Sequence, residues 1–195
     1  MQMMLANNFY VDEGYMPRFH HIMSKRYNRN VENVILGSSI TYGVVTESAV
    51  TYSFPGAKVE HLYSVPNNIK QEYPNASRII IYLGSNNFLG DRQGKSLPES
   101  PDQVIPKLKK LVRICQQQGL IVKLCPLIGL QGKKEICIEY NKLLRGVAGE
   151  MQLEVCSIRG ANYKRDIRDK NPKTGRDGVH PTVAGINKIV ACFKF

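Results

Sequence analysis

Three short segments of this 195-residue chain carry side chains that together could perform acyl transfer. They are residues 37–40 (GSSI), 84–87 (GSNN) and 177–180 (DGVH). A serine hydroxyl becomes a nucleophile when an imidazole takes its proton, and that imidazole needs a carboxylate to fix its tautomer and stabilise its cation. Ser39, His180 and Asp177 supply these three roles, so they are the candidate catalytic residues.

Acyl transfer also needs hydrogen-bond donors directed at the oxyanion that develops in the transition state. Asn86 offers a side-chain amide, and the backbone N–H groups of Ser39 and Gly56 offer two more donors. Gly56 lies in the segment 53–57 (SFPGA), where a glycine lets the backbone approach a substrate closely. These three residues are the candidate oxyanion hole.

The elements that must hold these segments alternate between strands and helices. Short apolar runs typical of buried parallel strands cover 34–36, 78–83, 120–125 and 153–157, with a weaker strand at 49–53. Helical spacing covers 59–73, 101–118, 133–151 and 182–195. This alternation predicts an α/β protein, a three-layer α/β/α sandwich with a mostly parallel, flavodoxin-like sheet of about five strands. Ligand sites of such sheets lie at the carboxyl ends of the strands, where all three segments fall.

The length of the chain predicts one domain with a full core. We expect residues 1–31 to be an irregular lead-in and residues 32–195 to form the domain. No run of about 18 apolar residues is present, which argues against a membrane span, and the N-terminus lacks the pattern of a secretory signal.

The cysteines, at positions 115, 125, 137, 156 and 192, are odd in number and lie in apolar stretches without C-x-x-C spacing. We therefore expect buried, reduced thiols and an intracellular, cytoplasmic protein. The pattern suggests no metal site, and the proposed chemistry needs no cofactor.

The net charge of +11 is concentrated in two places. Residues 159–176 hold seven basic and two acidic side chains, and a second basic group lies at 107–113. The candidate nucleic-acid-binding residues of the first stretch are Arg159, Lys164, Arg165, Arg168 and Lys170. Such clusters mark either a footprint for nucleic acid or another anionic surface, or a solvated face that keeps the protein soluble.

Each catalytic candidate also has an ordinary structural interpretation. Ser39 could cap a helix, Asn86 could be a turn residue, and His180 could be a surface loop histidine. The order Ser, Asp, His along the chain, with each segment at a predicted strand end or before the last helix, favours the catalytic interpretation.

The segments resemble the signature of the SGNH (GDSL) hydrolase superfamily over about residues 33–195. In that resemblance Ser39 matches the nucleophile, Gly56 and Asn86 match the oxyanion donors, and Asp177 and His180 match the Asp-x-x-His block. The most specific match is 177–182 (DGVHPT) followed by Ala-Gly. The resemblance implies a serine esterase without a cofactor.

Two positions depart from the family pattern. Ser38 stands where the family has an aspartate before the nucleophile, and Asn87 stands where an aspartate follows the block's asparagine. Neither is a signature position, but both replacements remove a carboxylate close to the site. These two replacements would be expected to lower the activity or to narrow the range of substrates.

A narrower resemblance involves residues 53–59 (SFPGAKV), residues 81–87 (IYLGSNN) and the basic charge. These features are similar to the esterase domain in first-open-reading-frame proteins of some LINE retrotransposons, which are nucleic-acid-associated factors. Two functions follow as hypotheses. One is a serine esterase acting on a short-chain, for example acetyl, ester through an acyl-enzyme on Ser39. The other is a basic nucleic-acid-binding module of a retroelement protein with weak or vestigial catalysis.

Overall fold

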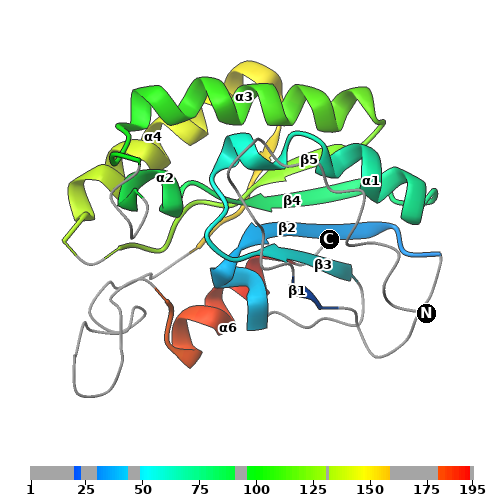
Figure 1. The fold of residues 1–195 in the computed structure, drawn as a ribbon, viewed down its shortest axis with the longest axis horizontal. Coiled ribbons are helices and arrows are strands. Elements are labelled where there is room, and N and C mark those ends of the chain that lie inside the picture. The colour runs from blue at the N-terminus through cyan, green and yellow to red at the C-terminus, as the bar shows by residue number, and fades with distance from the viewer. Residues whose placement is uncertain are drawn as a thin grey trace.

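A computed structural model describes residues 20–22, 30–43, 49–90, 96–130, 132–158 and 180–193. Its centre is a six-stranded sheet in the order β1-β3-β2-β4-β5-β6, in which the strands from β2 to β6 are parallel (Figure 1). The strands are β1 (His20–Ile22), β2 (Asn33–Ser38), β3 (Ala49–Phe54), β4 (Arg78–Tyr82), β5 (Ile121–Leu124) and β6 (Glu154–Val155). The five parallel strands follow the flavodoxin-like order. The predicted sheet is confirmed.

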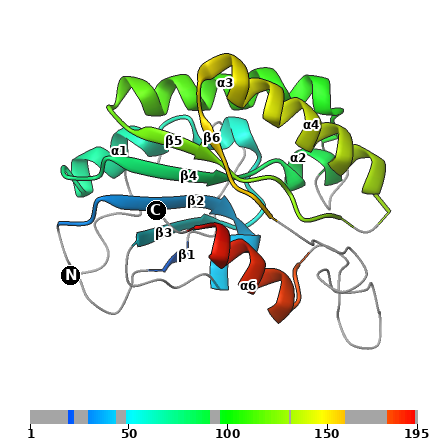
Figure 2. The ribbon, with the colours of Figure 1, turned by 180° about the vertical axis from the view of Figure 1, so that it is seen from behind.

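Helices cover both faces of this sheet. They are α1 (Val65–Glu72), α2 (Ser85–Leu89), α3 (Pro101–Gln117), α4 (Lys134–Met151) and α6 (Val183–Cys192), with two 3₁₀ helices, η1 (Ser39–Gly43) and η2 (Val59–Leu62). Figures 1 and 2 show α3 and α4 on one side of the strands and α6 on the opposite side. The predicted three-layer α/β/α sandwich is therefore confirmed.

The core sits where the central strands meet the helices. All six residues of β2 are buried, and so are Ile79, Ile80 and Ile81 of β4, because helices cover both faces of these strands. On α3, the apolar residues that recur at helical spacing are buried, namely Val104, Leu108, Leu111, Val112 and Cys115. The carboxyl ends of the strands are thereby held in fixed positions.

Three elements differ from the prediction. The single helix expected over 59–73 is divided into η2 and α1, because Pro66 lies in the first turn of α1 and cannot donate a backbone hydrogen bond there. The short helix α2 follows Gly84 directly, where no helix was predicted. Finally, β1 lies within the lead-in that we expected to be irregular, and it pairs antiparallel with β3, with His20 opposite Ser53.

All five cysteines are buried, as predicted. However, Cys156 at the end of β6 is joined to Cys192 at the end of α6 by a disulfide bond, so the prediction of reduced thiols is wrong for this pair. The Cys125 sulfur lies 4.0 Å from that of Cys192. The expected cytoplasmic location was inferred from unpaired cysteines and from the lack of a signal pattern, and the disulfide removes the first of these two grounds.

Among the helices of the described ranges, none is both long and apolar enough to cross a bilayer.

Candidate active site

Ser39 and His180, which are 141 residues apart in the sequence, meet in the folded chain. The Ser39 Oγ and His180 Nε2 atoms are 2.9 Å apart, within hydrogen-bond distance, and both side chains are partly buried. This is the geometry in which an imidazole can take the proton of a serine hydroxyl. The structure therefore brings these two candidate residues together, and their catalytic roles stay a prediction.

Ser39 is held by the tight turn that ends β2. Thr41 Oγ1 donates a hydrogen bond of 2.9 Å to the Ser38 carbonyl, and a Cβ at Gly37 would lie only 2.3 Å from Thr41 Cγ2. Glycine is therefore required at position 37. Ser39 is the first residue of η1, so its backbone N–H precedes the first hydrogen bond within that helix.

His180 lies just before α6. Thr182 caps this helix, since its Oγ1 accepts a hydrogen bond of 3.2 Å from the Gly185 N–H. Further along α6, Ile189 and Cys192 are buried against the core. The imidazole is thus carried by the start of a helix whose position on the sheet is fixed.

The register of the sheet places the other candidates at the same edge. β2 lies between β3 and β4, with Ser38 opposite Phe54 and Gly37 opposite Tyr82. Neighbouring strands are about 4.8 Å apart. The segments that follow these strands, which contain Ser39, Gly56 and Asn86, therefore emerge side by side.

Gly56 lies in a turn that immediately follows β3. The Ala57 N–H donates to the Phe54 carbonyl at 3.0 Å, and Gly56 has a φ angle of 80°. Proline at the second and glycine at the third position of such a turn are typical of type II. The hydrogen bond of the turn uses the Ala57 amide, and Gly56 itself is exposed.

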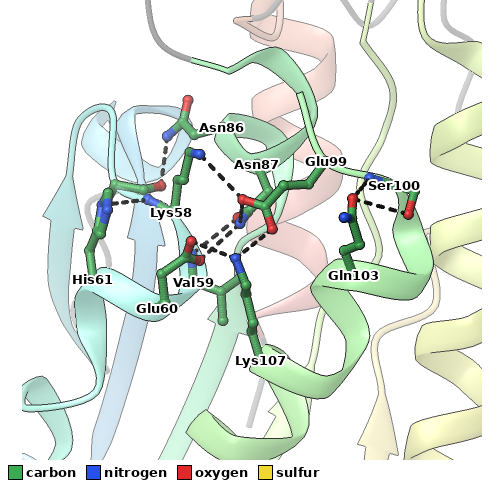
Figure 3. Close-up of polar contacts among 11 residues, drawn as sticks. Lys58, Val59, Glu60, His61, Asn86, Asn87, Glu99, Ser100, Gln103 and Lys107 are labelled. Carbon is green, nitrogen blue, oxygen red and sulfur yellow. Dashed lines mark hydrogen bonds and ion pairs between the residues drawn. The ribbon is translucent and has the colours of Figure 1, made fainter. Parts of the chain in front are cut away.

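Asn86 lies on α2, next to the Gly56 turn. Its Nδ2 donates a hydrogen bond of 2.8 Å to the Ala57 carbonyl (Figure 3). An amide NH₂ has two hydrogens, so this bond orients the group and leaves one hydrogen for another acceptor. α2 can start here because Gly84 adopts a φ angle of 119°, and a Cβ there would lie 2.9 Å from the Tyr140 ring.

Behind Asn86, its neighbour Asn87 is completely buried within a group of charged side chains (Figure 3). Asn87 Nδ2 donates to Glu60 Oε2 at 2.9 Å and to Glu99 Oε1 at 3.1 Å. Lys107 Nζ donates to both carboxylates, at 2.7 and 2.5 Å, and Lys58 Nζ donates to Glu99 at 3.2 Å. We call these five residues the Asn87 cluster. Sequence reasoning missed the four charged members, and the only signal was the asparagine itself.

Contacts within the cluster shift the pKa values of Glu60 and Lys107. Burial by itself raises the pKa of Glu60, but hydrogen bonds from Lys107, the Glu60 backbone and Asn87, with the charge of Lys107, together lower that pKa below its ordinary value. For Lys107, burial lowers the pKa, whereas its bonds to Glu60 and Glu99 raise it above its ordinary value. Both groups are therefore charged at neutral pH.

These pKa shifts predict how stability depends on pH. The pKa of Glu60 is lowered on folding, so its stabilising contribution is present above its ordinary value of 4.5 and is lost as the pH falls through the folded-state pKa. The pKa of Lys107 is raised, so its contribution is present below its ordinary value of 10.5 and is lost at higher pH. Replacing Glu60 with glutamine should lower the melting temperature at neutral pH more than in acid.

Thermal unfolding followed by circular dichroism, from about pH 3 to about pH 8, would measure this difference. Glu139→Gln is the matched control, because Glu139 is exposed on α4. A constant difference between Glu60→Gln and the parent protein across this pH range would contradict the prediction.

Of the four basic residues in the second group, 107–113, three have partners within the protein and Arg113 is exposed. Lys107 belongs to the Asn87 cluster, Lys109 forms an ion pair with Glu150 at 2.5 Å, and Lys110 lies 4.5 Å from the centre of the Tyr63 ring. Asp177 and the basic stretch 159–176 lie outside the described residues. The predictions for them remain predictions.

Solved structures with similar folds were found among esterases and lipases. A lipolytic protein of the G-D-S-L family from Veillonella parvula is 19% identical, with a TM-score of 0.60 over 82% of this chain and 94% of that chain. An acetylxylan esterase from Geobacillus stearothermophilus is 15% identical, with a TM-score of 0.58 over 89% of this chain and 94% of that chain. No family model and no curated protein matches the sequence. The chain therefore has the fold of the GDSL (SGNH) hydrolases.

Proposed function

We propose that this protein is a serine esterase that hydrolyses a short-chain carboxylic ester through an acyl-enzyme on Ser39. The observation that carries the proposal is the 2.9 Å contact between Ser39 Oγ and His180 Nε2 at the carboxyl edge of the sheet. Gly56 and Asn86 follow the two strands that flank β2, where the oxyanion donors of such a site would be needed.

The chemistry would proceed in two halves. His180 Nε2 takes the Ser39 proton as the oxygen attacks the ester carbonyl, and the negative charge moves to the carbonyl oxygen. The backbone N–H groups of Ser39 and Gly56 and the free hydrogen of Asn86 Nδ2 stabilise that oxyanion. His180 then gives the proton to the departing alcohol. In the second half, water attacks the acyl-enzyme with His180 again as base, and the acid and free Ser39 are released.

Asp177 would orient the imidazole in this scheme. That role comes from the spacing of the Asp-x-x-His block, three residues before His180. Its carboxylate would hold the imidazole tautomer in which Nε2 accepts a proton, and it would stabilise the imidazolium that forms.

An acetyl group is the acyl chain that we propose. Some solved structures with a similar fold are acetylxylan esterases, one of them 16% identical with a TM-score of 0.61 over 82% of this chain and 96% of that chain. The alternative of a nucleic-acid-binding module has less support, since Lys107, Lys109 and Lys110 are engaged within the protein.

The direct test is hydrolysis of p-nitrophenyl acetate beside p-nitrophenyl octanoate, together with labelling by a fluorophosphonate probe. We expect a higher kcat/KM for the acetate, and attachment of the probe at Ser39, located by mass spectrometry. Faster hydrolysis of the octanoate would contradict the acetyl preference alone. An absence of both hydrolysis and labelling in the folded protein would contradict the esterase itself.

A further inference from the structure

The Asn87 cluster carries an inference that extends the proposed function and rests on it. We propose that this cluster positions the oxyanion donors Gly56 and Asn86, and that it does so only with an uncharged residue at position 87. The aspartate that the SGNH pattern has at this place would therefore impair this particular chain.

Positioning follows from how the hydrogen bonds connect two segments. Asn87 Oδ1 accepts from the Val59 N–H at 3.1 Å, while its Nδ2 donates to Glu60 and Glu99. One residue earlier, Asn86 Nδ2 donates to the Ala57 carbonyl. Residues 57–60 are thus bonded side by side to residues 86–87 of α2 (Figure 3). Gly56 directly precedes the bonded segment in the sequence.

The two lysines form ion pairs with the two carboxylates of the cluster. Lys107, from α3, bonds both Glu60 and Glu99, and Lys58, from the segment itself, bonds Glu99. The Lys58 and Glu99 side chains are only 11% and 14% exposed, so this ion pair is largely shielded from water. A shift of the segment 57–60 would break several of these bonds together.

Charge explains why position 87 has to be neutral. Two carboxylates face two ammonium groups, so the formal charges sum to zero with an amide at position 87. An aspartate would place an acceptor oxygen where Nδ2 now donates, about 3 Å from carboxylate oxygens of Glu60 and Glu99. Asn87 is 0% exposed, so water could not screen this repulsion.

Three variants test the proposal: Asn87→Asp, Glu99→Gln and the double variant with both changes. The double variant restores a net charge of zero, and its new amide at position 99 can donate to the carboxylate at position 87 in place of the lost bond. We expect Asn87→Asp to lower kcat about 10- to 100-fold with a smaller change in KM, because misplaced donors act mainly on the transition state. The double variant should recover part of that loss, because its aspartate still faces Glu60. Asn75→Asp, in an exposed turn, is the matched control and should keep the parent kcat.

A second readout does not depend on activity. Hydrogen exchange of the Val59 amide reports directly on its bond to Asn87. We expect faster exchange in Asn87→Asp and restored protection in the double variant. If the parent protein hydrolyses no ester, the esterase proposal fails, and this exchange alone decides whether the cluster holds the segment.

The outcomes separate clearly. Parent-like kcat and parent-like Val59 exchange in Asn87→Asp would overturn the proposal, as would a loss that the second change does not repair. If Asn87→Asp does not fold, Lys107→Met tests the same charge balance without changing position 87. Lys107→Met should lower kcat, and adding Glu99→Gln should restore kcat. A parent-like kcat in Lys107→Met would overturn the proposal.

Discussion

Alanine at position 39 is expected to lower kcat for ester hydrolysis about a million-fold, with little change in KM. Losses of about this size follow removal of the serine or the histidine from an assembled serine protease triad, because the residues act as a unit. Ser39 Oγ is 2.9 Å from His180 Nε2, and no acyl-enzyme can form without that oxygen. Adding His180→Ala to Ser39→Ala should cost almost nothing more.

The matched control is Ser38→Ala, one residue earlier. Ser38 is 1% exposed, and within the described part of the chain its Oγ has no hydrogen-bond partner. Removing an unsatisfied buried hydroxyl is expected to leave stability unchanged or slightly raised, and kcat should stay close to that of the parent protein. Initial rates on p-nitrophenyl acetate would measure both variants. Activity above about one per cent in folded Ser39→Ala would show that Ser39 is not the nucleophile.

The central part of the fold could be predicted because it depends on local composition. The runs at 34–36 and 79–83 are continuously apolar, as strands covered on both faces must be, and α3 repeats its apolar residues at helical spacing. The place of Ser39 was predictable for the same reason, because the carboxyl ends of parallel strands share one edge. His180 comes just before α6, so its meeting with Ser39 was expected from the order of the motifs and the family resemblance instead.

The parts that were not predicted depend on contacts between distant residues. β1 is only three residues long and exists through its pairing with β3. Glu60, Glu99 and Lys107 look like ordinary surface charges in the sequence, and only the fold brings them around Asn87. Likewise, the spacing of five cysteines does not reveal that Cys156 pairs with Cys192. Pro66 was a visible signal for the break between η2 and α1, and the prediction overlooked it.

The second large effect is expected at Asp177. Changing Asp177 to asparagine should lower kcat about 10,000-fold if its carboxylate sets the tautomer of His180, as in serine proteases. His180 presents Nε2 to Ser39, so Nδ1 must carry the proton whenever Nε2 acts as base. An asparagine can present its NH₂ group to the ring instead, which favours the inactive tautomer, and it brings no charge to stabilise the imidazolium.

Asp169→Asn removes the same charge from the preceding basic stretch, so it separates a specific role from a general electrostatic effect. We expect its kcat to stay within about two-fold of the parent value, with both variants checked for folding by circular dichroism. A loss of less than about ten-fold in Asp177→Asn would show that Asp177 does not orient His180. Because Ser39 and His180 are 2.9 Å apart in the parent structure, the site would then act as a serine–histidine pair whose imidazole is oriented by another group.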